Sequence, residues 1–180
     1  MSNSIQTIGA GLDRVSAIVG NVKQFLSPQL DHKRRLSLAD AMKSTLNMLS
    51  PQLEGKVSIH QDYKTGGVIE GVADQIDQLF LNLIKNAVEA MNGSGELKIR
   101  MAEEEKGLMV TIQDSGPGIP AEILPHLFES FFTTKKGKGG TGLGLSICKK
   151  IVERHHGEIG IKSIEGGGTE VRVLFPLLGI

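Results

Sequence analysis

The chain has 180 residues, of which 39% are hydrophobic and 22% charged, so it can form one compact domain with an appended element. Its 20 lysines and arginines balance its 20 aspartates and glutamates, which gives no electrostatic case for a nucleic acid or an anionic membrane as partner. A single cysteine excludes an internal disulfide, and no apolar run has the length of a membrane span. We therefore expect a cytoplasmic setting.

The first segment carries apolar residues at alternating steps of three and four, the pattern of a helix in a coiled coil or bundle. They are Ile5, Ile8, Leu12, Val15, Val19, Val22 and Leu26. We expect residues 1–30 to form an incomplete bundle helix that makes a homodimer through residues 5–26. The alternative is a helix that folds back on its own domain. The charged residues 31–37 are expected to form a linker.

Residues 38–53 have an apolar face at helical spacing and follow Ser37, a residue type that commonly caps helices. We expect the first helix of a domain there. Residues 57–62 and 68–72 alternate partly between apolar and polar side chains and are expected to be strands.

The next predicted helix begins at Asp74, which we expect to cap it, and ends at Asn92 and Gly93. Its apolar side chains share one broad face, and polar side chains gather on the opposite face. These polar residues are Gln78, Asn82, Lys85, Asn86 and Glu89.

Residues 96–104 and 108–114 are expected to be paired strands. The second strand places Asp114 at the end of a row of core-facing side chains, where a buried carboxylate needs a hydrogen-bond donor. A turn with two glycines and two prolines follows at residues 115–120.

Residues 121–132 are expected to form a short helical stretch, and residues 133–140 a mobile loop. The glycine run 139–144 then leads directly into an apolar helix that ends before Gly157. Such a junction suits a phosphate group, because the free N–H groups and the dipole of a helix N-terminus favour an anion. The last two expected strands are residues 158–164 and 169–175.

Four blocks in a fixed order resemble the catalytic and ATP-binding domain of sensor histidine kinases, in the superfamily that also includes gyrase, the Hsp90 chaperones and MutL. They are an asparagine box at 82–87, a first glycine box at 114–119, a phenylalanine box at 128–132 and a second glycine box at 140–144. The resemblance covers residues 38–180 and extends to the nitrogen-regulatory branch. It implies an α+β fold, a two-layer sandwich of the Bergerat type with a mixed sheet of about five strands packed on three helices. A lid is implied at about residues 119–141.

The resemblance also implies roles for individual residues. Asp114 would accept a hydrogen bond from the exocyclic amine of adenine, and Thr169 would support that site through its hydroxyl or a water molecule. Asn86 would be the magnesium ligand, with Asn82 beside it, and Glu89 would position a metal-bound water.

The glycine boxes and the lid are expected to supply the other contacts with ATP. The residues concerned are Gly116, Gly118, Ile119, Lys135, Gly140, Thr141, Gly142, Leu143 and Gly144. Phosphate contact is assigned to Lys135, with Lys138 as a weaker candidate, because this chain lacks a lysine and an arginine that some family members carry at the places of Glu89 and Thr133. The three phenylalanines of the phenylalanine box are expected to anchor the lid to the core.

A histidine kinase of this family phosphorylates a histidine on the first helix of a dimeric four-helix bundle, normally followed by an acidic residue. The five histidines here, none of which fits that pattern, are His32, His60, His126, His155 and His156. Residues 5–26 resemble the second helix of such a bundle. We therefore expect a piece of a longer protein that binds ATP and magnesium but does not phosphorylate itself, and we expect His155 and His156 to be structural.

Three functions stay open. The leading hypothesis is a domain that transfers the γ-phosphoryl group of ATP to a histidine-bearing helix of the same kinase or of a partner, from which a response regulator takes the phosphate. One alternative is a serine kinase of the anti-sigma type. The other is an interaction module in which ATP orders the lid without phosphotransfer.

Overall fold

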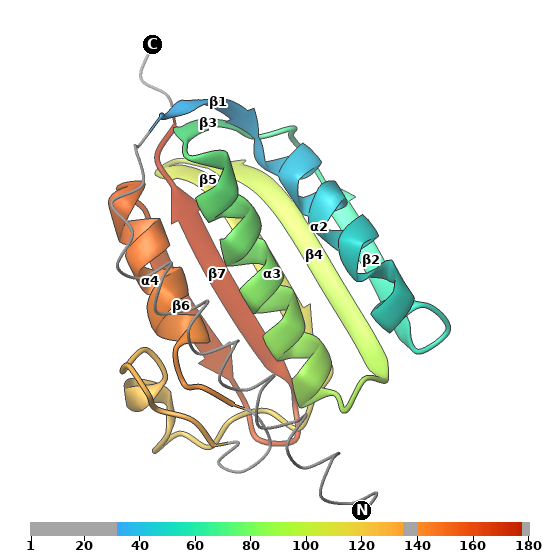
Figure 1. Cartoon of the computed structure of the whole chain (residues 1–180). Helices are drawn as coiled ribbons and strands as arrows, with labels where there is room; N and C mark the ends of the chain where they lie inside the picture. The colour runs from blue at the N-terminus through green and yellow to red at the C-terminus, as the bar shows by residue number, and fades with distance from the viewer. Residues whose placement is uncertain (1–31, 135–139, 178–180) are drawn as a thin grey trace, which may run out of the picture.

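The computed structural model describes residues 32–134 and 140–177. Three helices lie side by side over one face of a five-stranded sheet, which makes a two-layer α+β sandwich (Figure 1). The elements are β1 (Arg34–Ser37), α2 (Leu38–Leu53), β2 (Val57–Tyr63), β3 (Val68–Gly71), α3 (Ala73–Ala90), β4 (Gly95–Glu104), β5 (Gly107–Asp114), the 3-10 turn η1 (Leu124–His126), α4 (Gly144–Arg154), β6 (Glu158–Ser163) and β7 (Thr169–Phe175). The expected fold class is confirmed.

The five-stranded sheet has the order β2-β4-β5-β7-β6, with β2 parallel to β4 and every other neighbouring pair antiparallel. Alternate residues of β4 and β5 point toward the helices and are buried. In β5 these are Leu108, Val110, Ile112 and Asp114. The sequence prediction of one core-facing row that ends in a carboxylate is therefore confirmed.

Helix α3 lies between α2 and α4 and forms the centre of the helical layer (Figure 1). Its buried apolar residues fall three and four apart, so they cover one side of the helix and pack on the sheet. They are Ile76, Leu79, Phe80, Leu83, Ile84 and Ala87.

The two helix starts predicted from capping residues have different outcomes. The Ser37 side chain accepts a hydrogen bond from the backbone N–H of Asp40 at 3.2 Å, so the predicted cap of α2 is confirmed. The prediction that Asp74 caps α3 is wrong, because Val72 occupies the N-cap position and Asp74 lies in the first turn. A carboxylate there still interacts favourably with the helix dipole.

Two other local predictions are corrected. Residues 34–37, expected in a linker, form β1 and pair with β3 in a separate two-stranded antiparallel sheet, where the inward side chain of Ile69 is buried. The helix expected at residues 121–132 is only the turn η1, because Pro125 lacks the N–H that a continuing helix would use. The expected bundle helix at residues 1–30 lies outside the described residues.

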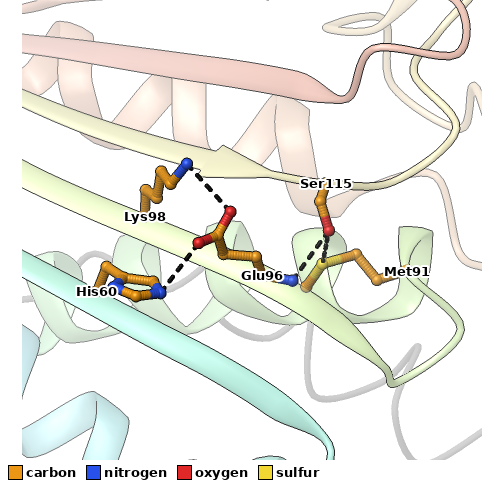
Figure 2. A network of polar contacts seen from close by, with 5 residues as sticks. All are labelled: His60, Met91, Glu96, Lys98 and Ser115. Carbon is orange, nitrogen blue, oxygen red and sulfur yellow. Dashed lines mark hydrogen bonds and ion pairs between the residues drawn. The ribbon is translucent and has the colours of Figure 1, made fainter.

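The other face of the five-stranded sheet carries charged side chains from adjacent strands. Glu96 on β4 lies between His60 on β2 and Lys98, with 3.0 Å from its carboxylate oxygens to each partner nitrogen (Figure 2). The hydrogen bond from Lys98 lowers the pKa of Glu96, and the charges of Lys98 and His60 act in the same direction. None of the described helices is long and apolar enough to cross a membrane.

Candidate functional site

A row of polar side chains crosses the sheet at the end where β5 stops, β7 begins and β6 stops. Asp114, the last residue of β5, lies directly opposite Thr169 on β7, and Thr169 lies opposite Ser163 on β6. Residues opposite one another in neighbouring strands project from the same face. Asp114 and Thr169 are 6% and 7% exposed, so the row continues the buried face of the sheet with hydrogen-bonding groups.

The Asp114 carboxylate is partly satisfied by the backbone. The N–H of Gly116 donates to its Oδ1 at 2.8 Å, and the backbone of Thr169 donates a second hydrogen bond. Burial raises the pKa of the Asp114 carboxyl above its ordinary value, while these two hydrogen bonds act in the opposite direction. An ionised carboxylate accepts about four hydrogen bonds, so capacity is left for a ligand that donates.

Ser163 connects three segments through one hydroxyl. Its Oγ accepts from the N–H of Ile119 at 2.8 Å, donates to the carbonyl of Gly168 at 2.8 Å and lies 2.9 Å from the Thr169 hydroxyl oxygen. Sequence reasoning missed this residue. The signal was available, because the expected strands 158–164 and 169–175 are joined by three glycines, and a hairpin there places Ser163 opposite Thr169.

The first glycine box packs against the turn between β6 and β7. Gly118 has φ +76°, and a Cβ there would collide with the backbone carbonyl of Ile164. A Cβ on Gly116 would lie 2.8 Å from Asp114 Oδ1 and 3.3 Å from the carbonyl carbon of Ala90 at the end of α3. Close packing of the backbone accounts for glycine at both positions. Their contact with a nucleotide stays a prediction.

The turn after Asp114 is also fixed to β4 by Ser115 (Figure 2). The hydroxyl of Ser115 accepts from the N–H of Glu96 at 2.9 Å and lies 3.5 Å from the sulfur of Met91, just past α3. The N–H of Ser115 donates to the carbonyl of Glu96 at 3.1 Å. The first glycine box therefore has a fixed place against both the sheet and the end of α3.

The two asparagines of α3 face α4. Burial raises the pKa of the Cys148 thiol on α4 to about 12, and the neighbouring Asn82 side chain acts in the opposite direction. One turn later, a Cβ on Gly144 would lie 3.9 and 4.0 Å from the amide nitrogen and oxygen of Asn86. The N-cap residue of α4, Leu143, makes no side-chain cap bond. The start of α4, with the positive end of its dipole, thus lies beside the Asn86 amide.

A backbone hydrogen bond joins the two ends of the predicted lid: the N–H of Phe131 donates to the carbonyl of Gly142 at 2.8 Å. Both residues have φ +68°, which is unusual for a phenylalanine. The Phe131 side chain is 70% exposed, so the expectation that it anchors the lid in the core is wrong, and its backbone makes the attachment. Phe128 makes a cation–π contact with α4, with 5.7 Å between its ring centroid and Lys149 Nζ.

Other predicted site residues have separate positions. Glu89 is exposed and lines a hollow between α2 and α3 with Lys85 and Leu53, and its role at a metal-bound water stays a prediction. Lys135 and Lys138 lie outside the described residues. Within residues 32–134 and 140–177, no group of three or more His, Cys, Asp or Glu side chains is placed to hold a metal ion.

The buried histidine at the far end of the helical layer is structural, as expected. His155 Nε2 accepts from the N–H of Val72 at 3.0 Å, and its Nδ1 donates to the carbonyl of Ile151 at 2.7 Å. The ring also makes an edge contact with Phe175, with 6.2 Å between ring centroids. It therefore joins the end of α4 to the start of α3.

The family described as histidine kinase-, DNA gyrase B- and HSP90-like ATPase matches residues 71–179. Sporulation kinase A of Bacillus subtilis (strain 168) is 36% identical over 169 residues, which cover 92% of this chain and 27% of that protein. The chain spans less than half the length of the first curated relatives that it matches.

Solved structures give the same result. The nucleotide-free catalytic domain of the histidine kinase ThkA has a TM-score of 0.73 at 30% identity, covering 81% of this chain and 95% of that chain. ThkA in complex with the response regulator protein TrrA has a TM-score of 0.80 at 25% identity, covering 97% of this chain and 51% of that chain. The resemblance to the ATP-binding catalytic domain of a sensor histidine kinase is confirmed, whereas the nitrogen-regulatory branch stays a prediction. The chain belongs to the family of histidine kinase-, DNA gyrase B- and HSP90-like ATPases.

Proposed function

We propose that this chain binds ATP with magnesium and transfers the γ-phosphoryl group to a histidine on another segment or subunit. The observation that carries the proposal is the arrangement along the last turns of α3. Ala90 lies at Gly116, beside the buried Asp114 carboxylate, and Asn86 lies at Gly144, where α4 begins. Asn86 and Ala90 are four residues apart, which is about 6 Å along the helix axis. The carboxylate proposed to read the base and the helix start proposed to bind phosphate therefore both lie beside the last turns of one helix, α3.

The Asp114 end of the proposed site selects a nucleobase that donates a hydrogen bond. A buried carboxylate accepts from the exocyclic amine of adenine, whereas the carbonyl of guanine at that position would bring two acceptors together. A site whose buried polar group is left unpaired rejects a ligand strongly. Asp114 is therefore assigned to the choice of adenine, with Thr169 beside it.

The phosphate end combines Asn86 with the second glycine box. The N-terminus of α4 presents backbone N–H groups and a positive dipole end, which favour a phosphate. Magnesium, when bound, would be held by the neutral amide oxygen of Asn86 together with phosphate oxygens and water, and it would neutralise charge that develops during transfer. Lys135 is assigned to the phosphates, in a lid that closes over them.

The acceptor is assigned to a histidine-bearing helix of the same kinase or of a partner, with a response regulator as the next recipient. Two findings support this part: sporulation kinase A is named as a kinase, and ThkA has been solved with the response regulator TrrA. We place the protein in the cytoplasm and assign residues 5–26 to the homodimer.

The experiment is a transfer assay with γ-labelled ATP, magnesium and a histidine-bearing helical bundle segment of a sensor histidine kinase as acceptor. Label that is lost in acid and kept in base identifies phosphohistidine and supports the proposal. Acid-stable label would identify a serine kinase instead. Tight ATP binding without any transfer to the acceptor would favour an interaction module.

A further inference from the structure

We propose that Ser163 is a positioning residue for nucleotide specificity, which fixes the hydroxyl of Thr169 as a hydrogen-bond acceptor toward the base. This inference rests on the proposed binding of ATP beside Asp114. The structure places Ser163 at the end of the row formed with Asp114 and Thr169, one strand further from the carboxylate.

The hydrogen bonds of Ser163 determine the direction of its neighbour. A serine hydroxyl offers one donor and two acceptor positions. Its single proton goes to the carbonyl of Gly168, which can only accept, and one acceptor position is taken by the N–H of Ile119. The third contact, at 2.9 Å, therefore has Thr169 as donor and Ser163 as acceptor. All three positions of the Ser163 hydroxyl are then used.

This assignment decides what the pocket presents to a ligand. The proton of the Thr169 hydroxyl points along the row to Ser163, so only the lone pairs of its oxygen remain for a neighbour. Asp114, when ionised, is also a pure acceptor. The end of the row therefore offers two acceptors side by side, which suit an amino group or a bridging water and oppose a carbonyl oxygen.

The same hydroxyl also holds the start of the lid. Ile119 follows the first glycine box, and its N–H has Ser163 as acceptor. Loss of this contact loosens the start of the lid for any nucleotide, and so weakens binding of all of them alike. The ratio of affinities for two nucleotides that differ only in the base removes this common effect.

The test compares ATP with inosine triphosphate, which has an oxygen in place of the 6-amino group, by calorimetric titration of the folded chain with magnesium. Ser163→Ala frees the Thr169 proton to turn toward the pocket, where it can donate to a carbonyl. We expect the ratio of the dissociation constants for inosine triphosphate and ATP to fall about five-fold, the effect of one net hydrogen bond. Ser163→Thr keeps a hydroxyl and is expected to keep the wild-type ratio.

A double-mutant cycle identifies the route of the effect. In a Thr169→Val background, which removes the hydroxyl at nearly constant shape, Ser163→Ala is expected to leave the ratio unchanged. An equal fall in that background, or no fall in the single variant, would overturn the inference. Ser58→Ala, in an exposed position of β2, is the matched control and should leave both affinities unchanged.

The outcomes also separate this inference from the proposed function. If wild type does not bind ATP, the proposed function fails. If wild type binds ATP but Ser163→Ala leaves the ratio of the two dissociation constants unchanged, only this inference fails. Thermal unfolding monitors the folded state of each variant. If Ser163→Ala does not fold, Ser163→Thr and Ser163→Val give the same comparison, because they differ only by a hydroxyl and a methyl group. Equal ratios in that pair would overturn the inference.

Discussion

We expect the hydrogen bond between His155 and Val72 to contribute measurably to the stability of the folded domain. The His155 side chain is 4% exposed, and its Nε2 is the acceptor for the N–H of Val72, which precedes α3 and has no side-chain cap of its own. His155→Phe keeps an aromatic ring beside Phe175 but removes the acceptor. The Val72 N–H is then left without its partner in a partly buried position.

The magnitude follows from that orphaned donor. A buried group left unsatisfied costs about 1–3 kcal/mol, and partial burial favours the lower part, about 1–2 kcal/mol. The Ile151 carbonyl adds little, because it also accepts from the backbone N–H of His155. For a chain of this length, each kcal/mol shifts the melting temperature by about 2–4 °C, so we expect a loss of roughly 2–8 °C.

Differential scanning calorimetry without nucleotide measures this loss, and His155→Gln is the matched control. The glutamine amide oxygen can reach the position of Nε2 and accept from Val72, so we expect it to recover part of the stability lost by the phenylalanine variant. Wild-type stability in His155→Phe would contradict a stabilising role for the hydrogen bond between His155 and Val72. So would a glutamine variant no more stable than the phenylalanine variant.

Three further predictions concern single positions. Asp114→Asn is expected to raise the melting temperature at pH 7, because burial raises the pKa of the Asp114 carboxyl and so opposes its ionised form. Wild type becomes more stable as the pH falls through the folded-state pKa of this carboxyl. Calorimetry should therefore show that the difference in melting temperature between the two proteins shrinks below neutral pH. His156 has φ +58° and occupies the C′ position after α4, so His156→Gly should add about 0.5–1 kcal/mol to the free energy of unfolding in urea; lower stability would contradict the assignment. Gly142→Ala would place a Cβ against the backbone of Phe131 and should weaken ATP binding at least ten-fold, roughly the effect of 1.4 kcal/mol, while Gly66→Ala, with open space around its Cβ, should bind as wild type does. Equal ATP affinity of these two glycine variants, measured by titration, would count against a fixed lid base.

The elements with long periodic patterns could be predicted from the sequence. The apolar spacing of α3 and the alternation in β5 each reflect one buried face, and such patterns survive in any fold that buries them. The position of Asp114 at the end of its row could be predicted for the same reason. Motif order then supplied the nucleotide hypothesis.

Features that depend on distant segments could not be predicted in the same way. Strand β1 forms because its backbone pairs with β3, more than thirty residues away in the sequence. Its four residues are too few for an alternating pattern that would predict a strand. The N–H at the start of α3 donates to His155, which is distant in the sequence, and the nearby Asp74 does not cap the helix. Phe131 has a left-handed backbone where its N–H contacts the carbonyl of Gly142, eleven residues further along the chain.

A titration of ATP with magnesium into wild type and Asp114→Asn tests the proposed nucleotide site most directly, under conditions where circular dichroism shows that both proteins are folded. The amide still offers an oxygen to the N–H of Gly116, but it replaces a carboxylate oxygen with a donor group. We expect saturable binding of one ATP to wild type and an affinity at least a hundred-fold lower for the variant, roughly the effect of 2.7 kcal/mol. Equal affinity in the two proteins would contradict a nucleotide site built on Asp114.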